Sequence, residues 1–532
     1  MVKGRAKLLM YLLLGVYGAV FVLMHLYSLD KAPNAVNVDE PWLSDAALQF
    51  LKNGRFGYSV FGDLFGLDKD VGFGNIHLFA EAMMFKLFGF GLYQARLVSF
   101  LSGLCLIWVT YLLGKRLYDR RTGVMSAVLF SLSGMFVDVS HLARQDMMLA
   151  LFMAASLYLY LLAREKRSKI LYFITGLLLA LSLDVHLNGV AMIVSIGVLF
   201  LWEYKSNVFR EKFFWFFVSG LFLGVMYFFC VHRLFLYQLN TEYYSWNRGA
   251  SPIFAIMNFG EFLRRILLGN KLYLSYFTGG QFHHKIVISL FVIFATAYRI
   301  YQRKKSDKIL LLILAVFGTL YVLVFANGLT SYLIYLYPFF YILISASIFS
   351  LIKDCQIGIL KWKTYEKRVY IGLAILMVIL LIGAGRYAKW TYKAYTGSPD
   401  ARSSYDYYSY VDNLKAHIPE HAVVSGNRGW FYGFHDQPYI SHFYFEWVAK
   451  TKGEKFRKEY GQNFAEAVEK RGIEYILADD WIGPRGSAVL REQYLHFLKH
   501  KCILVATVMS EYPFSGFTPG ELHKTEIYRV KR

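Results

Sequence analysis

Two adjacent carboxylates, Asp39 and Glu40, lie in the stretch NAVNVDEPWLSDAALQF at residues 34–50, directly after an apolar run. A carboxylate beside a membrane surface can accept a proton from a hydroxyl or an amine. Two carboxylates on an irregular loop can also bind a divalent cation such as Mg²⁺, Mn²⁺ or Zn²⁺. The structural alternative is a solvated loop in which Ser44 or Asp45 caps a helix. The pair is therefore a candidate general base or metal site.

A second candidate lies in HLARQDMMLALF, residues 141–152, where Arg144 and Asp146 precede an apolar segment. Ionisable groups near a membrane are costly to bury and are often functional. Asp146 could orient an acceptor, or join Asp39 and Glu40 around a cation. Both residues also have ordinary explanations, since Asp146 suits a helix N-terminus and Arg144 could reach lipid phosphate.

A basic set occupies the long segment between residues 233 and 284 and comprises Arg264, Arg265, Lys271, His283 and His284. Cations of this kind bind phosphate, and anionic phosphate at the lipid surface is one target. Lipid headgroup binding without chemistry is the alternative. Other polar candidates at the membrane boundaries are His77, Glu81, His141, His186, Asn188 and Tyr332.

Long apolar segments must position these side chains. The chain has 532 residues, of which 56% are hydrophobic, and this excess falls in uninterrupted blocks. That pattern is typical of a polytopic α-helical membrane protein. We expect about 11 transmembrane helices, and a surface or re-entrant segment near residues 75–88. The expected spans are 8–29, 93–113, 123–139, 145–163, 170–184, 187–203, 213–232, 285–301, 308–326, 329–351 and 367–388.

The formal net charge of +21 comes from Lys and Arg residues that gather in short loops between these segments. Every second loop is basic, which predicts a cytoplasmic N-terminus and a C-terminus on the opposite side of the cell membrane. This placement favours membrane lipid as a partner and argues against nucleic acid. The four cysteines are scattered without metal-ligand spacing and imply no disulfide framework.

The composition changes after about residue 390. TGSPDARSS at 396–404 is typical of a linker, and helical patterns then alternate with apolar strands at 422–425, 473–478 and 502–509. We therefore predict a transmembrane catalytic domain at residues 1–390 and a soluble extracytoplasmic α/β domain at 391–532. Within the second domain, GWFYGF at 429–434 is interpreted as a strand followed by a turn.

Several motifs in order resemble the GT-C class of membrane glycosyltransferases. They are VDEPWLSDAALQFLKNG, NIHLFAEAMMFKLFGFGLYQARLVSFLSG, YLLGKRLYDRRTG, SHLARQDMMLALFMAASLYLY and, later, SYLIYLYPFFYIL. The resemblance is to the branch that contains protein O-mannosyltransferases and lipid A aminoarabinose transferases, families 39 and 83, and it covers roughly residues 7–205.

This resemblance implies an enzyme that takes a hexosyl or pentosyl group from a polyprenyl-phosphate carrier. Transfer would occur with inversion, on the outer face of the membrane, to a protein, lipid or glycan. The family's first acidic residue falls on Asp39, with Glu40 beside it, and the second falls on Asp146, preceded by Arg144. A divalent cation is compatible with this chemistry but is not required.

Two other classes of protein remain open from the sequence. A lipid-linked sugar flippase would place charged residues near the bilayer midplane, often within inverted repeats, and no repeat is evident here. A non-catalytic lipid or sugar sensor would use the α/β domain for recognition. An oligosaccharyltransferase of the same broad fold is a further possibility, although GWFYGF lacks the acidic residue of that family's Trp-Trp-Asp motif.

Overall fold

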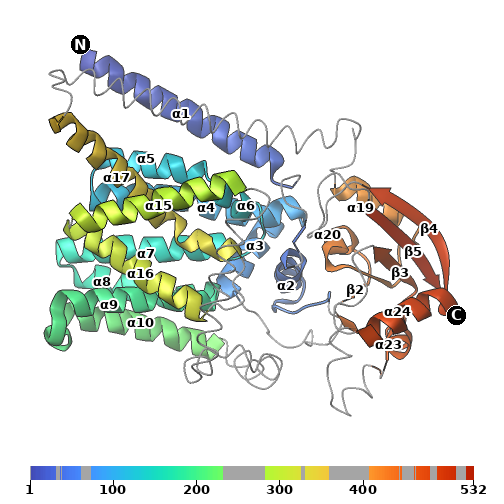
Figure 1. The fold of residues 1–532 in the computed structure, drawn as a ribbon. Coiled ribbons are helices and arrows are strands. Elements are labelled where there is room, and N and C mark those ends of the chain that lie inside the picture. Colours follow the sequence, from blue (N-terminus) through green and yellow to red (C-terminus); the bar gives the residue numbers. More distant parts are fainter. Residues whose placement is uncertain are drawn as a thin grey trace.

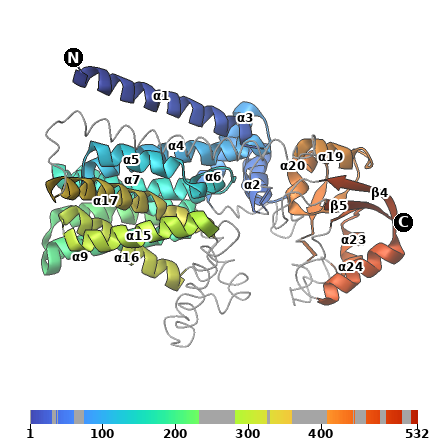
Figure 2. The ribbon, with the colours of Figure 1, turned by 45° about the horizontal axis from the view of Figure 1, so that its top comes forward.

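A computed structural model describes residues 2–30, 36–37, 39–60, 74–231, 282–302, 304–324, 330–358, 407–442, 444–445, 461, 463–479, 488–510 and 523–531. These residues form a bundle of long helices and a smaller domain around a β-sheet (Figure 1). The helices α2 (Glu40–Asn53) and α3 (Asn75–Phe88) lie at the end of the bundle that faces the sheet domain, in both views (Figures 1 and 2).

Every predicted span within the described residues falls on a helix, and the predicted span 367–388 lies outside them. The bundle consists of α1 (Val2–Ser28), α4 (Leu92–Leu117), α5 (Arg120–Ser131), α6 (Gly134–Ser140), α7 (Asp146–Lys166), α8 (Lys169–Val185), η1 (Leu187–Gly189), α9 (Val190–Tyr204), η2 (Lys205–Arg210), α10 (Lys212–Val231), α15 (Phe282–Gln302), α16 (Lys305–Val324), η5 (Thr330–Tyr335) and α17 (Tyr337–Gly358). By length and composition, five described helices can cross a membrane, or six if α5 and α6 form one span.

Two predicted spans differ from single straight helices. The stretch 123–139 is divided into α5 and α6, which are bent by 60°. The Ser133 hydroxyl accepts a hydrogen bond from the amide of Phe136, which begins the second helix. The stretch 329–351 begins as the 3-10 helix η5, and α17 starts only at Tyr337, with Pro338 in its first turn where proline is tolerated.

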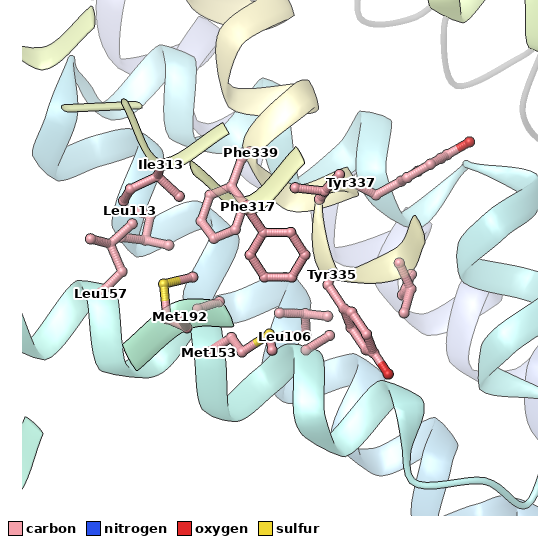
Figure 3. Packing of buried hydrophobic residues seen from close by; sticks show 14 of the residues in the cluster. Leu106, Leu113, Met153, Leu157, Met192, Ile313, Phe317, Tyr335, Tyr337 and Phe339 are labelled. Carbon is pink, nitrogen blue, oxygen red and sulfur yellow. The ribbon is translucent and has the colours of Figure 1, made fainter. Parts of the chain in front are cut away.

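The core of the bundle is formed by apolar side chains from α4, α7, α9, α16 and α17. Leu106, Met153, Met192, Phe317 and Phe339 are among them and lie in contact across these helices (Figure 3). Helices α8 and α10 pack especially closely. A Cβ atom on Gly176 would overlap the carbonyl oxygen of Phe217, so the absence of a side chain permits this approach.

The second domain contains a five-stranded sheet in the order β2-β1-β3-β5-β4. Strand β1 is parallel to β2 and β3, whereas β5 is antiparallel to β3 and β4. Its elements are α19 (Tyr407–Lys415), β1 (Val424–Gly426), η6 (Arg428–Trp430), α20 (Phe431–Phe434), β2 (Tyr439–Ser441), α23 (Phe464–Lys470), β3 (Tyr475–Asp479), α24 (Ala488–Lys501), β4 (Cys502–Ser510) and β5 (His523–Val530).

The three strands predicted in this domain are confirmed with shifted ends, and β2 and β5 were not predicted. The interpretation of GWFYGF as a strand and turn is wrong, because these residues form η6 and α20. The side chain of Asn427 accepts a hydrogen bond from Gly429 and starts this helical segment. The domain boundary near residue 390 lies outside the described residues and stays a prediction.

The sheet domain is joined to α2, α3 and the start of α4 by a shared apolar cluster. Polar bonds cross the same junction. The amide of Leu92 donates to the hydroxyl of Tyr408 at 2.9 Å, and the amide of Ser441 donates to the carbonyl of Val60 at 2.8 Å. The start of α2, which carries Asp39, is therefore held between the two parts of the protein.

Candidate active site

Asp39, Arg144 and Asp146 meet at the end of the bundle that faces the sheet domain. Asp39 precedes α2, and Arg144 forms ion pairs with both carboxylates. The Arg144 Nε atom lies 2.9 Å from Asp146 Oδ2, and the Tyr335 hydroxyl donates to Asp146 Oδ1 at 2.9 Å. The Asp146 side chain is fully buried, whereas 31% of the Asp39 side chain is exposed. Asp39 is therefore the more accessible of the two carboxylates.

The turn between α6 and α7 explains how Arg144 reaches two carboxylates. The amide of Arg144 donates to Leu142 at 2.8 Å, and its carbonyl accepts from the Ser99 hydroxyl at 2.9 Å. The backbone at this turn is thus attached to α4. Asp146 then occupies the first turn of α7, where a carboxylate is favoured by the helix dipole.

Aromatic and polar side chains surround this group. The rings of Tyr332 and Tyr335 in η5 stack with centroids 5.8 Å apart, and the ring of His186 lies 5.5 Å from Tyr332. The amide of Asn188 donates to His186 Nδ1 at 3.1 Å. The predicted candidates Tyr332, His186 and Asn188 are therefore brought together with Asp146.

Burial lowers the pKa of His186 to about 4. The carboxylate of Asp146 opposes this decrease, and the guanidinium of Arg144 adds to it. The imidazole is consequently neutral at pH 7 and can offer a hydrogen bond but no positive charge. Among the described candidates near Asp146, the fixed positive charge is that of Arg144.

Glu40 faces away from this group, although it is adjacent to Asp39 in sequence. Its carboxylate forms a fully buried, bidentate salt bridge with Arg96 of α4, with N–O distances of 2.8 and 3.0 Å. It also accepts from the amide of Ala143 at 2.7 Å. Arg96 in turn donates to the carbonyl of Leu29. Glu40 thus links α2, α4, the end of α1 and the turn before Arg144.

His77 and Glu81 belong to a separate buried polar group. His77 Nε2 lies 3.1 Å from Glu81 Oε1, and Glu81 Oε2 accepts from the Ser44 hydroxyl at 3.1 Å. The Ser44 oxygen lies 2.7 Å from the hydroxyl of Tyr432 in the sheet domain. These side chains are buried at the junction of α2, α3 and α20.

Of the remaining candidates, His141 has its contacts elsewhere in the bundle. His141 Nδ1 lies 2.9 Å from the carbonyl of Val137, and its ring stacks on His25. Arg264, Arg265 and Lys271 lie outside the residues that the structure describes. His283 and His284 fall in the first turn of α15.

The three carboxylates predicted as a possible metal site do not converge. Glu40 binds Arg96, and Arg144 occupies the space between Asp39 and Asp146 where a cation would be needed. No group of three or more His, Cys, Asp or Glu side chains in the described part of the chain is arranged to hold a metal ion. In the described residues, Asp39, Glu40 and Asp146 therefore do not fit a metal centre.

Asp45, one turn into α2, makes the stability of this region depend on pH. Its carboxylate accepts hydrogen bonds from Gln49, Ser59 and Val60. Burial nevertheless raises the pKa of Asp45 from 3.8 to about 6. A raised pKa means that the folded protein holds this proton more tightly than the unfolded chain does. The contribution of Asp45 to stability therefore falls as pH rises from about 4 to 6, by about 3 kcal/mol.

Asp45→Asn removes this titration, so we expect its stability relative to the wild type to improve as pH rises through this window. Thermal unfolding of both proteins in the same detergent at pH 4, 5, 6 and 7 measures the difference. A difference in melting temperature that stays constant across the series would contradict the raised pKa.

Residues 76–232 match the model of the dolichyl-phosphate-mannose-protein mannosyltransferase family. An uncharacterized protein of Aquifex aeolicus (strain VF5) is 27% identical over 180 residues. This match covers 33% of the chain and 35% of the relative, so the chain spans about a third of that relative's length.

The fold is similar to that of ArnT from Cupriavidus metallidurans bound to undecaprenyl phosphate. The TM-score is 0.58 with 13% identity, over 96% of this chain and 97% of that one. The oligosaccharyltransferase of Archaeoglobus fulgidus, tethered with an acceptor peptide, gives a TM-score of 0.51 with 12% identity, over 90% and 72% of the chains. The predicted resemblance to GT-C glycosyltransferases is confirmed, and the described residues form a helical fold similar to theirs together with a C-terminal sheet region.

Proposed function

We propose that this protein is an inverting glycosyltransferase that moves a sugar from a polyprenyl-phosphate carrier to an acceptor on the outer face of the cell membrane. The observation that carries the proposal is the partly exposed Asp39 carboxylate beside the buried Arg144–Asp146 pair. A proton acceptor and a fixed cation are the two groups that such a displacement needs. The similarity to a structure that holds undecaprenyl phosphate supports the class of donor.

In the proposed reaction, Asp39 accepts the proton of an acceptor hydroxyl or amine. The acceptor atom then attacks the anomeric carbon from the face opposite the phosphate, and the bond from that carbon to the phosphate oxygen breaks. Polyprenyl phosphate leaves with the electron pair, and the guanidinium of Arg144 meets its negative charge. One displacement from the opposite face inverts the anomeric carbon.

The surrounding residues support these two groups. Asp146 holds Arg144 through Nε, and Tyr335 fixes Asp146 from the other side. One outer nitrogen of the guanidinium, Nη1, contacts Asp39, so a donor phosphate would approach the other outer nitrogen, Nη2. Tyr332 and the neutral His186 offer further polar contacts to the donor. Arg264, Arg265, Lys271, His283 and His284 remain proposed donor ligands on the basis of the sequence alone.

The proposed topology follows from the basic loops. The N-terminus lies in the cytoplasm, and the sheet domain, from about residue 391, lies outside with the Asp39–Asp146 group. The donor tail would remain in the bilayer beside the bundle while its phosphate reaches Arg144. The acceptor, a protein, a lipid or a glycan, would approach from the side of the sheet domain.

Purified protein in lipid, supplied with a panel of polyprenyl-phosphate hexoses and pentoses and a mixed acceptor extract, tests the proposal. We expect acceptor-dependent release of polyprenyl phosphate with at least one donor. Movement of intact donor across vesicles without release would instead identify a flippase. Binding of donor with neither release nor movement would identify a sensor.

A further inference from the structure

Helix α2 is attached at two successive turns to different parts of the protein. At its first residue, Glu40 binds Arg96 of the bundle. One turn later, the Ser44 oxygen lies 2.7 Å from the hydroxyl of Tyr432, which belongs to α20 of the sheet domain. Both contacts are buried, and α2 and α20 lie next to each other in Figures 1 and 2. The first contact fixes where α2 begins, and the second restrains its rotation.

The direction of the hydrogen bonds at Ser44 follows from the number of protons available. The Ser44 hydroxyl has one proton, which it donates to Glu81 Oε2 at 3.1 Å. The Ser44 oxygen must then accept the bond from Tyr432. Loss of the Tyr432 hydroxyl therefore removes this hydrogen bond between α2 and the sheet domain, while the Ser44–Glu81 bond remains.

The neighbours of Tyr432 hold its ring in one place. The ring stacks on Phe90, just before α4, at a centroid distance of 5.6 Å, and the ring of Phe90 also lies 4.5 Å from that of His435. Tyr432 itself is 1% exposed. The stacking of Tyr432 on Phe90 thus holds the Tyr432 hydroxyl next to α2.

We propose that Tyr432 is a positioning residue by which the sheet domain sets the orientation of α2 and hence of Asp39. This inference rests on the proposed function, because it takes Asp39 as the general base. Asp39 directly precedes α2, and its carbonyl accepts from the amide of Leu43 in the first turn. A change in the tilt or rotation of α2 therefore moves the carboxylate relative to the acceptor.

The experiment compares Tyr432→Phe with Tyr410→Phe in the full-length protein. Tyr410 is also buried, and its hydroxyl bonds to Thr525 within the sheet domain, so this control removes a similar bond that does not reach α2. We expect Tyr432→Phe to lower kcat about tenfold with the donor KM unchanged, because misplacement of a reacting group slows the chemical step. Tyr410→Phe should change kcat less than about twofold. Equal effects of the two variants on kcat would overturn the proposal.

Two further variants separate positioning from a general loss of stability. In an Asp39→Asn background, Tyr432→Phe should leave the residual rate unchanged, since the group it positions is already gone. In a Ser44→Ala background, the effect of Tyr432→Phe should also disappear, because its bonding partner is absent. A full tenfold effect in either background would show that Tyr432 acts by another route.

Hydrogen exchange distinguishes failure of this inference from failure of the proposed function. If the wild type transfers no sugar from any donor, the proposed function fails. Hydrogen exchange at the backbone amides of residues 39–48 then still tests whether Tyr432 restrains α2. We expect faster exchange there in Tyr432→Phe than in Tyr410→Phe. Identical exchange in both variants would refute a role of Tyr432 in holding α2.

Discussion

Replacing Asp39 by asparagine is expected to lower kcat for sugar transfer about 10³-fold, with little change in the donor KM. Asparagine matches the carboxylate in size but cannot accept the acceptor proton, and a positioned general base contributes about 10²–10⁴-fold. In the proposed reaction, the exposed fraction of the Asp39 side chain, 31%, gives the acceptor access to the carboxylate. Release of polyprenyl phosphate by wild type and variant, at matched amounts of folded protein, measures the effect.

Glu40→Gln is the matched control for this substitution. It makes the same chemical change at the next residue, but at a carboxylate that is fully buried against Arg96. Leaving Arg96 without a counter-charge should cost about 3–5 kcal/mol of stability. Its cost should therefore appear as a lower melting temperature and yield, with a much smaller loss of kcat. If both variants lost kcat equally, per folded molecule, Asp39 could not be distinguished as the general base from Glu40 as a structural carboxylate.

Arg144→Gln is expected to lower kcat/KM for the donor about 10³-fold, through both a higher KM and a lower kcat. In the proposed reaction, the guanidinium binds the donor phosphate and then meets the charge that develops as polyprenyl phosphate leaves. Because Asp146 is fully buried, loss of its partner should also destabilise the protein. Steady-state kinetics over a range of donor concentrations, with melting temperatures alongside, separates these effects.

Arg144→Lys provides the control for charge. A lysine keeps the positive charge but has a single nitrogen in place of the planar fork that contacts both Asp39 and Asp146. We expect kcat/KM of Arg144→Lys to lie between those of the wild type and Arg144→Gln, with a smaller change in the donor KM than in kcat. If Arg144→Gln binds donor as tightly as the wild type, the phosphate lies elsewhere and the basic residues of 233–284 become the candidates.

The sequence predicted the helices well because their apolar lengths and basic flanks are local signals. The helix at 75–88 and the start of α7 at Asp146 were placed correctly for this reason, whereas the surface or re-entrant character of residues 75–88 stays a prediction. The bend between α5 and α6 was missed because the whole stretch is apolar and only Ser133 and Gly134 mark the break. GWFYGF was misassigned because aromatic residues favour strands, whereas Asn427 starts a helical turn there.

The sequence identified the residues of the candidate site better than it identified which of them contact each other. Asp39, Arg144 and Asp146 were identified by type and position, and they do meet. Glu40 was grouped with Asp39, yet consecutive residues at a helix start point in different directions, and Glu40 reaches Arg96 instead. Arg96 was visible as a cation within an apolar segment, but its partner, 56 residues earlier in the chain, follows only from the tertiary fold.

The order of Glu40 and Arg96 along the chain bears on how the protein enters the membrane during synthesis. An arginine in an apolar helix resists transfer into lipid. Glu40 emerges from the ribosome before Arg96, so the counter-ion is already available when α4 partitions into the bilayer. Ala143, which donates the final amide to Glu40, emerges last. The order of these residues along the chain therefore allows Glu40 to pair with Arg96 before Ala143 is made.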